Sequence, residues 1–173
     1  MPDRLVLGID PGVASTGVGV VRERDRRFES VAYDVIRTPA SQAFPDRLAA
    51  LHRACGLLLK QYRPDVMALE RLFFTKNAKT AIAVGQAQGV ILLAASQART
   101  PVYDYTPVEV KSAVTGDGRA DKPAVAFMIQ RLLALAELPR PDDAADALAV
   151  AYCHLVSTRR GITAPRRLLG SHP

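Results

Sequence analysis

The segment Leu7-Gly8-Ile9-Asp10-Pro11-Gly12 joins a short apolar run to a carboxylate and a turn. The apolar run, which begins at Leu5, is typical of a buried strand, and Asp-Pro-Gly is typical of the turn that ends one. A second apolar run at 18–21 resumes the strand pattern, which predicts a hairpin. The sequence therefore predicts a carboxylate at the point where the first strand of a sheet stops.

The rest of the chain changes between extended and helical patterns of apolar residues. The segments that we expect to form strands are 5–9, 18–21, 28–38, 66–69 and 102–105. The segments that we expect to form helices are 41–62, 80–99, 108–116, 121–138 and 142–158. This order predicts an α/β fold, in which a mixed five-stranded sheet is flanked by helices.

The length of 173 residues is typical of a single domain that folds without disulfides. The only cysteines, Cys55 and Cys153, form no CxxC motif, so we expect no zinc site and a reducing, cytoplasmic compartment. The longest apolar run, around Val90–Ala95, is too short to cross a membrane. We expect one domain over residues 1–158 and a basic, flexible tail over residues 159–173. The net charge of +6 would suit an anionic partner.

Four carboxylates lie at the ends of predicted elements. Asp10 and Glu70 each follow a strand, while Asp143 and Asp146 lie in the first turns of the last predicted helix. Residues three apart on a helix share a face, and so do residues four apart, so the spacing leaves Asp142 and Asp143 as alternatives. Taken singly, an acid at a strand end is usually a solvated turn residue, and an acid in a first helical turn stabilises the helix dipole.

A cluster of all four acids would have a chemical use, because carboxylates that converge repel one another unless cations hold them. Carboxylate oxygens are the hard ligands that bind Mg²⁺. Two such ions about 4 Å apart activate a water and stabilise the leaving oxygen in phosphodiester hydrolysis. Asp146 is the acid that a capping role explains least, since it lies among apolar residues of the helix.

Five segments, taken in order, resemble the RuvC family of Holliday junction resolvases. They are Leu7–Gly12 with Thr16-Gly17, Leu69-Glu70 with Phe73, Phe74 and Lys76-Asn77-Ala78, Gly85–Gly89, Val110-Lys111 with Lys122, and Asp143–Ala149. The resemblance implies a ribonuclease H-like fold and a homodimer. It also implies an endonuclease of recombination and repair that resolves four-way DNA junctions by paired symmetric nicks.

The resemblance further implies which residues carry the chemistry. It assigns catalysis and metal binding to Asp10, Glu70, Asp143 and Asp146, and it selects Asp143 over Asp142 because the family's pair is spaced D-x-x-D. It implies two Mg²⁺ ions per active site, with Mn²⁺ as a substitute. It also implies a partner, a branch-migration motor of the RuvA–RuvB type.

The loop 71–79 directly follows Glu70 and carries three basic residues and no acid. Basic side chains there would neutralise phosphates, which gives affinity without reading sequence. Either phenylalanine of the loop could pack inward or stack on unpaired bases at a junction centre, and the resemblance favours Phe73 for stacking. The residues that we expect to contact DNA are Arg71, Phe73, Phe74, Lys76, Lys79, Lys111 and Lys122.

The predicted helix Thr80–Arg99 is rich in alanine and glycine, which permits a second helix to approach closely. We expect the dimer contact on this helix, with burial in the monomer core as the alternative. A two-fold dimer would place two equivalent sites on a junction of matching pseudo-symmetry.

Three other functions fit parts of the sequence. An actin-like or sugar-kinase ATPase opens with a similar strand and turn, but it needs a second, similar half for which 173 residues leave no room. A nuclease of pre-ribosomal RNA with the same fold shares the Gly-Ile-Asp opening, but the basic loop and the Asp143–Asp146 pair argue against it. A DNA-binding module without catalysis suits the net charge, but four acids that face DNA would oppose its binding.

Overall fold

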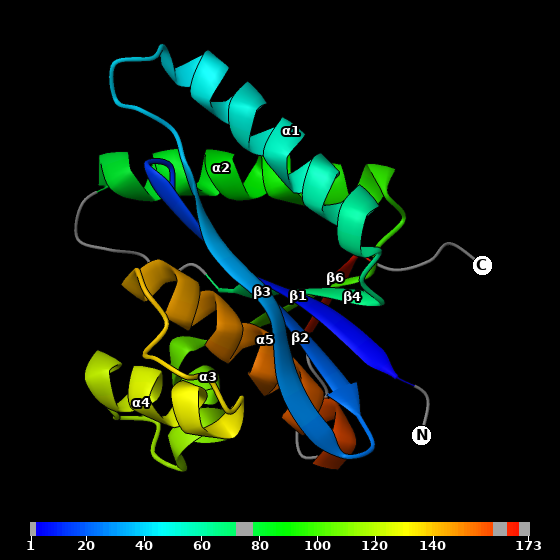
Figure 1. The fold of residues 1–173 in the computed structure, drawn as a ribbon. Coiled ribbons are helices and arrows are strands. Elements are labelled where there is room, and N and C mark those ends of the chain that lie inside the picture. The colour runs from blue at the N-terminus through cyan, green and yellow to red at the C-terminus, as the bar shows by residue number, and fades with distance from the viewer. Residues whose placement is uncertain (1–2, 72–77, 161–165, 170–173) are drawn as a thin grey trace.

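The structure is a computed structural model that describes residues 3–71, 78–160 and 166–169. Within these ranges, one sheet has the strand order β3-β2-β1-β4-β5-β6, and helices cover both of its faces (Figure 1). The strands are β1 Arg4–Asp10, β2 Ser15–Arg24, β3 Arg27–Arg37, β4 Val66–Glu70, β5 Val102–Tyr105 and β6 Arg166–Leu169. The helices are α1 Phe44–Tyr62, α2 Ala78–Gln97, α3 Pro107–Thr115, α4 Lys122–Leu132 and α5 Asp142–Arg160.

The sheet is mixed, as the sequence predicts. Strands β1, β2 and β3 are antiparallel neighbours, whereas β4 runs parallel to β1 and β5 runs parallel to β4. Helices α1 and α2 lie on one face of the sheet, and α3, α4 and α5 lie on the other (Figure 1). Because β1 and β4 are parallel neighbours, their carboxyl ends meet at one edge of the sheet.

The prediction of five strands was wrong, because six form within the described residues. Strand β6 lies inside the segment 159–173 that we expected to be a flexible tail, and it pairs antiparallel with β5. Without it, the backbone groups along one side of β5 would lack partners in the sheet. Leu168 also packs against the core on the α1 and α2 side. Helix α5 extends through Arg160 and so crosses the boundary that we expected at residue 158.

Two further boundaries differ from the sequence prediction. The strands expected at 18–21 and 28–38 extend to Arg24 and back to Arg27, so the turn between them is only Asp25-Arg26, both with positive φ (49° and 64°), as a two-residue hairpin turn requires. The helix expected at 121–138 ends at Leu132, because Ala134 adopts the left-handed conformation (φ 52°) that no regular helix continues through. Asp121 is not part of this helix but caps it, since its side chain accepts from the amide of Ala124.

Glycines on β1 and β2 let α5 lie directly on the sheet. A Cβ atom built on Gly8 would come within 2.1 Å of the Ala147 carbonyl oxygen, and one on Gly17 within 1.9 Å of the Asp143 carbonyl oxygen. Both obstacles are backbone atoms, which cannot rotate away. The amino-terminal turns of α5 therefore rest against the strands only because these positions carry no side chain.

Alternation along the central strands decides which face each side chain occupies. On β1, Leu7 and Ile9 belong to the core on the α1 and α2 side, so Asp10 faces α5. On β4, Leu69 belongs to the same core, so Glu70 also faces α5. The two carboxylates at the strand ends therefore point to the face on which α5 lies.

Among the helices of the described ranges, none combines the length and apolar character that crossing a bilayer requires. Cys55 and Cys153 are buried thiols without a disulfide, one in each core.

Candidate active site

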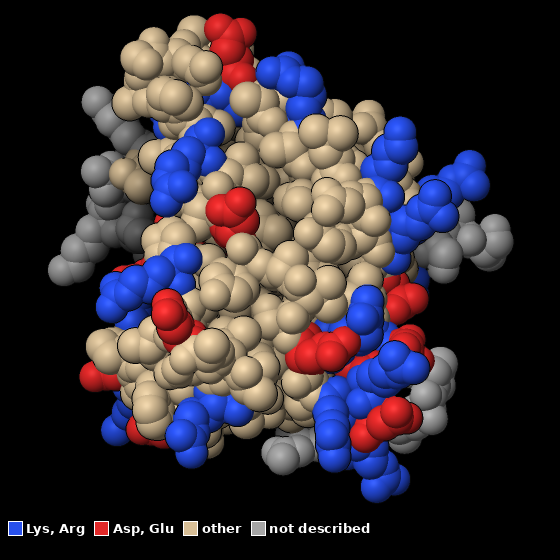
Figure 2. All heavy atoms as spheres, viewed as in Figure 1, with Lys and Arg blue, Asp and Glu red and all other residues tan. Residues whose placement is uncertain are grey.

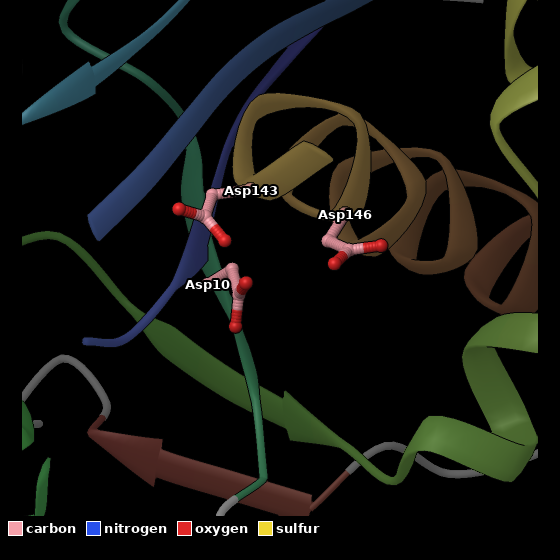
Figure 3. A group of neighbouring side chains, drawn as sticks. All are labelled: Asp10, Asp143 and Asp146. Carbon is pink, nitrogen blue, oxygen red and sulfur yellow. The ribbon is translucent and has the colours of Figure 1, made fainter. Parts of the chain in front are cut away.

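Three acidic side chains from two distant parts of the chain meet at the end of β1. Asp10 ends β1, while Asp143 and Asp146 lie in the first turns of α5, and each offers a carboxylate oxygen within 4.8 Å of the others. Figure 3 shows the three side chains around one common space. All three are half-buried, so the space opens to solvent.

Glu70 joins this group from the neighbouring strand. Its carboxyl group shares a side-chain hydrogen bond with that of Asp10, as expected for groups at the ends of paired parallel strands. The four acids that the sequence singles out are thus brought together by β1, β4 and α5.

The cluster disfavours ionisation in the protein alone. Burial, followed by the charges of Glu70, Asp146 and Asp143, raises the pKa of Asp10 to about 8. Burial and the charge of Asp146 likewise raise the pKa of Glu70. Burial and the neighbouring acids thus hold these carboxyl groups toward their neutral form, and a bound cation would add positive charge that favours ionisation.

Two lysines supply part of that positive charge. The Nζ atom of Lys122, on α4, donates to Asp146 Oδ2 at 2.7 Å, and this bond raises the pKa of the lysine. Lys111, on α3, acts on Glu70 electrostatically and opposes the rise of its pKa. The structure therefore places both predicted lysines at the acid cluster.

Asp142 lies outside the cluster. It is exposed and lines a surface hollow of about 240 Å³ together with Lys122, Arg140 and Asp146. Of the two alternatives that helical spacing leaves open, Asp143 is the one that approaches Asp10.

The predicted DNA contacts of the loop 71–79 fall largely outside the described residues. Phe73, Phe74 and Lys76 lie outside them, as does the side chain of Lys79. Arg71 is described, and its guanidinium group bonds the buried carboxylate of Asp104.

Sequence analysis missed a hydrogen bond that holds one of the acids. The hydroxyl group of Ser15, at the start of β2, donates to Asp143 Oδ2. Groups that bond a metal-binding side chain from behind fix its orientation and strengthen metal binding. The nearness of Ser15 to Asp143 could not be read from their separation of 128 positions.

We expect Ser15→Ala to weaken the binding of a divalent cation about tenfold, because Asp143 would lose the bond that orients it. The variant should need a higher concentration of Mg²⁺ or Mn²⁺ for half-saturation, whereas Ser15→Thr should behave as wild type. Calorimetric titration with each metal checks this. Equal titration midpoints for Ser15→Ala and wild type would contradict it.

The residues present fit a divalent metal site. They offer only carboxylate oxygens, the donor type that Mg²⁺ and Mn²⁺ take, and no thiolate or imidazole lies among them in the described ranges. His154, farther along α5, is buried instead between Tyr103 and Tyr105 and accepts or donates a bond at 2.7 Å to the hydroxyl group of Tyr105. Burial lowers the pKa of His154 to about 4, so it stays neutral near pH 7 and fills a packing role.

Comparison with known proteins agrees with this geometry. The family model described as crossover junction endodeoxyribonuclease RuvC matches residues 6–154. The chain belongs to the RuvC family. A RuvC-family protein of Moorella thermoacetica is 55% identical over 150 residues, covering 87% of this chain and 90% of the relative. One of Syntrophomonas wolfei is 51% identical over 154 residues, covering 89% and 90%.

Solved structures of the RuvC family share the fold along nearly the whole chain. Thermus thermophilus RuvC superimposes with a TM-score of 0.87 at 36% identity, covering 95% of this chain and 99% of the Thermus chain. The same Thermus protein, in complex with Holliday junction substrate, gives a TM-score of 0.86 at 35% identity. The yeast mitochondrial resolvase Ydc2, at 15% identity and a TM-score of 0.65, shares the fold alone. The ribonuclease H-like fold expected from the sequence is thereby confirmed.

Proposed function

We propose that this protein is a metal-dependent crossover junction endodeoxyribonuclease, which cuts four-way DNA junctions by paired, symmetric nicks during recombination and repair. The observation that carries the proposal is the meeting of Asp10, Asp143 and Asp146 within 4.8 Å, with Glu70 bonded to Asp10, in a chain of the RuvC family. The solved complex of Thermus RuvC with Holliday junction substrate supports the choice of DNA.

Asp10, Glu70, Asp143 and Asp146 would hold two divalent cations, Mg²⁺ or, as a substitute, Mn²⁺. When bound, such ions make water a nucleophile at neutral pH and stabilise charge on the leaving oxygen. Asp10 bonds Glu70 and also lies in the group with the α5 acids, so its carboxylate would be the one placed centrally among the acids that hold the cations. Hydrolysis would leave a 5′ phosphate and a 3′ hydroxyl.

The lysines would act on the DNA. Lys122 is exposed apart from its bond to Asp146, and cations bound to the acids would compete for that carboxylate. Its ammonium group would then be available to the phosphate that is cut. Lys111 would add charge from the side of Glu70, and Arg71 would add charge where β4 ends. These contacts bind phosphate without reading bases.

We also propose that the protein works as a homodimer that pairs through α2. One side of α2 is buried in the core by Ala87, Ile91, Ala94 and Ala95. The opposite side is exposed along Ile82, Gly85, Gly89 and Leu93, and a Cβ atom on either glycine would meet no other atom. An exposed stripe that carries two large apolar side chains, with glycines between them, suits the close approach of a second helix.

We expect Gly85→Leu and Gly89→Leu to convert the dimer to monomers, because each places a bulky side chain between the two helices. The monomer should stay folded, since the added atoms meet open space within one chain. Sedimentation velocity checks this, with Gly56→Leu on α1 as the control, because that site is also open. If both α2 variants sediment as dimers, the contact lies elsewhere.

The setting follows from the same family. We propose a cytoplasmic enzyme that works beside a branch-migration motor of the RuvA–RuvB type, and the two buried, unpaired thiols suit a reducing compartment.

A synthetic four-way junction tests the proposed function. With Mg²⁺, the protein should nick two opposite strands, and it should cut neither without metal nor on linear duplex of the same sequence. Preference for RNA, or cleavage of linear duplex at a similar rate, would refute it. Junction binding with no cleavage at any Mg²⁺ or Mn²⁺ concentration would favour a DNA-binding module without catalysis.

A further inference from the structure

The feature that the proposed chemistry leaves unexplained is the side chain of Asp104, on β5. The exposed fraction of this side chain is 0%, so water cannot solvate its charge. Instead, each of its two oxygens accepts hydrogen bonds from two guanidinium groups. Arg71 donates from Nε and Nη2, each at 2.9 Å, and Arg166 donates from the same two atoms at 3.1 and 2.6 Å. Burial opposes ionisation of this carboxyl, but the hydrogen bonds from Arg71 and Arg166 keep its pKa below the usual value.

The cluster connects three strands at the end of the sheet that carries the acids. Arg71 directly follows Glu70, and its backbone amide donates to the Tyr105 carbonyl at 2.7 Å. Arg166, on β6, is the register partner of Asp104. By alternation with Val102, Asp104 faces the α1 and α2 side, whereas Glu70 faces α5. Glu70 therefore points to the acid cluster on the α5 face, whereas the next residue, Arg71, is bonded to Asp104 on the α1 and α2 face.

The charges do not cancel within the cluster. Two guanidinium groups face one carboxylate, which leaves a net charge of about +1. The bonds of Arg71 to Asp104 use one edge of its guanidinium group, and its side chain is still 31% exposed. The other edge, with Nη1, is free of these bonds, and its direction is fixed because Asp104 holds the guanidinium group.

Basic side chains are not gathered on the face that Figure 2 shows, where Lys and Arg are interspersed with Asp and Glu around the margin. That face therefore carries no broad basic patch of described residues.

We propose that Asp104 and Arg166 are positioning residues, which hold Arg71 so that its outer edge meets the DNA backbone at the end of β4. Strand β6, which carries Arg166, would then contribute to DNA binding. This inference rests on the proposed function. Arg166 has two effects. It holds the Asp104 carboxylate in place by donating to both of its oxygens, and its positive charge neutralises that carboxylate. The positive charge of Arg71 is then not cancelled by Asp104. Arg71 therefore keeps its attraction for phosphate although it is paired.

Asp104→Asn gives the sharpest test, because a simple charge argument predicts the opposite result. Removing an acid near DNA should tighten binding, whereas removing the group that orients Arg71 should loosen it. We expect Asp104→Asn and Arg71→Gln each to weaken junction binding by about tenfold, since each removes one well-placed phosphate contact. The double variant should bind no more weakly than Arg71→Gln, because the two residues act as one unit.

The measurement is the Kd for a labelled four-way junction in Ca²⁺, over a range of salt concentrations. Arg71→Gln and Asp104→Asn should both lower the slope of log Kd against log salt by about 1. Arg166→Gln, at a side chain that is 61% exposed, should fold normally and weaken binding by a smaller factor, about threefold. Arg22→Gln breaks the exposed Arg22–Glu29 pair on the β2–β3 hairpin with the same change of charge and should leave binding unchanged.

The inference is overturned if Asp104→Asn binds as tightly as wild type or more tightly, or if its loss adds to that of Arg71→Gln. Should Asp104→Asn fail to fold, Arg166→Gln decides the matter, and equality with Arg22→Gln overturns the inference. Failure of the proposed function looks different, because wild type itself would then show no preference for the junction over linear duplex.

Discussion

Replacing Asp10 by asparagine is expected to abolish junction cleavage while junction binding persists. Asp10 is the acid that bonds Glu70 and also joins the α5 pair, so its loss would remove a proposed metal ligand from the centre of the site. Metal ions contribute several kcal/mol to such a reaction, and about 4 kcal/mol corresponds to about a thousandfold in rate. We expect a loss of at least that size.

The same variant should stabilise the metal-free protein at alkaline pH. The pKa of Asp10 lies at about 8 in the folded chain against a usual value of 3.8. Between these values the unfolded chain loses the proton and the folded chain keeps it, so wild-type stability falls as pH rises through this window. Asparagine does not ionise, so Asp10→Asn should exceed wild type by about 1–3 kcal/mol at pH 8, and the gain should fade toward pH 4.

Thermal unfolding in chelator across pH 4–8, together with cleavage assays, checks both halves of this prediction. Added Mg²⁺ should raise the Tm of wild type and should have little effect on Asp10→Asn. A variant that still cuts within tenfold of wild type would contradict the assigned role of Asp10. A variant that is less stable than wild type at pH 8 would contradict the electrostatic account.

Gly8→Ala is expected to be strongly destabilising, although it adds only one carbon atom. The new Cβ would lie 2.1 Å from the Ala147 carbonyl oxygen and 2.8 Å from the Ala151 amide nitrogen, so α5 must move off the sheet. Overpacking against rigid neighbours costs about 3 kcal/mol or more, which is a fall in Tm of about 6–12 °C for a chain of this size. Cleavage should fall as well, because α5 carries Asp143 and Asp146.

Gly56→Ala is the matched control for this substitution. Gly56 lies inside α1, and a Cβ atom there meets nothing within 4 Å. The exchange should stabilise the protein by about 0.5–1 kcal/mol, since alanine favours a helix interior over glycine. Calorimetry of the two variants beside wild type separates a steric effect from a general effect of replacing glycine. Equal Tm values for Gly8→Ala and wild type would show that α5 does not rest on β1 as described.

The members of the acid cluster could be selected from the sequence because each lies at the end of a predicted strand or at the start of a predicted helix. Asp10 and Glu70 follow short apolar strands, and the position of Asp146 among apolar residues of a helix marks it as unusual. Parallel neighbours bring their ends to one edge, but the sequence analysis predicted no strand order, and it was the resemblance to the RuvC family that assigned the four acids to one site. Spacing alone left Asp142 and Asp143 open, and only the fold distinguishes their distances from Asp10.

The features that escaped prediction depend on contacts between distant segments. Strand β6 has only four residues, two of which are arginines, so its sequence looks like part of a basic tail. It forms a strand because it pairs with the edge of β5 that β4 does not occupy. The Arg71–Asp104 bond joins residues 33 positions apart, and Arg166 lies another 62 positions from Asp104. No local periodicity records such pairings. The glycines of β1 and β2, by contrast, lie on one face at alternate positions, which is a pattern that sequence reasoning could have used.

The direct contact of α5 with the glycine positions of β1 and β2 has a consequence for ion selectivity. Mg²⁺ requires oxygens at about 2.0–2.1 Å, whereas Ca²⁺ takes them at about 2.3–2.6 Å. A helix that already touches the sheet through backbone atoms cannot come closer, so these glycines set the shortest distance between the α5 carboxylates and Asp10. Discrimination between small and large cations would then originate in how closely the main chain of α5 approaches the sheet, at residues that never touch an ion.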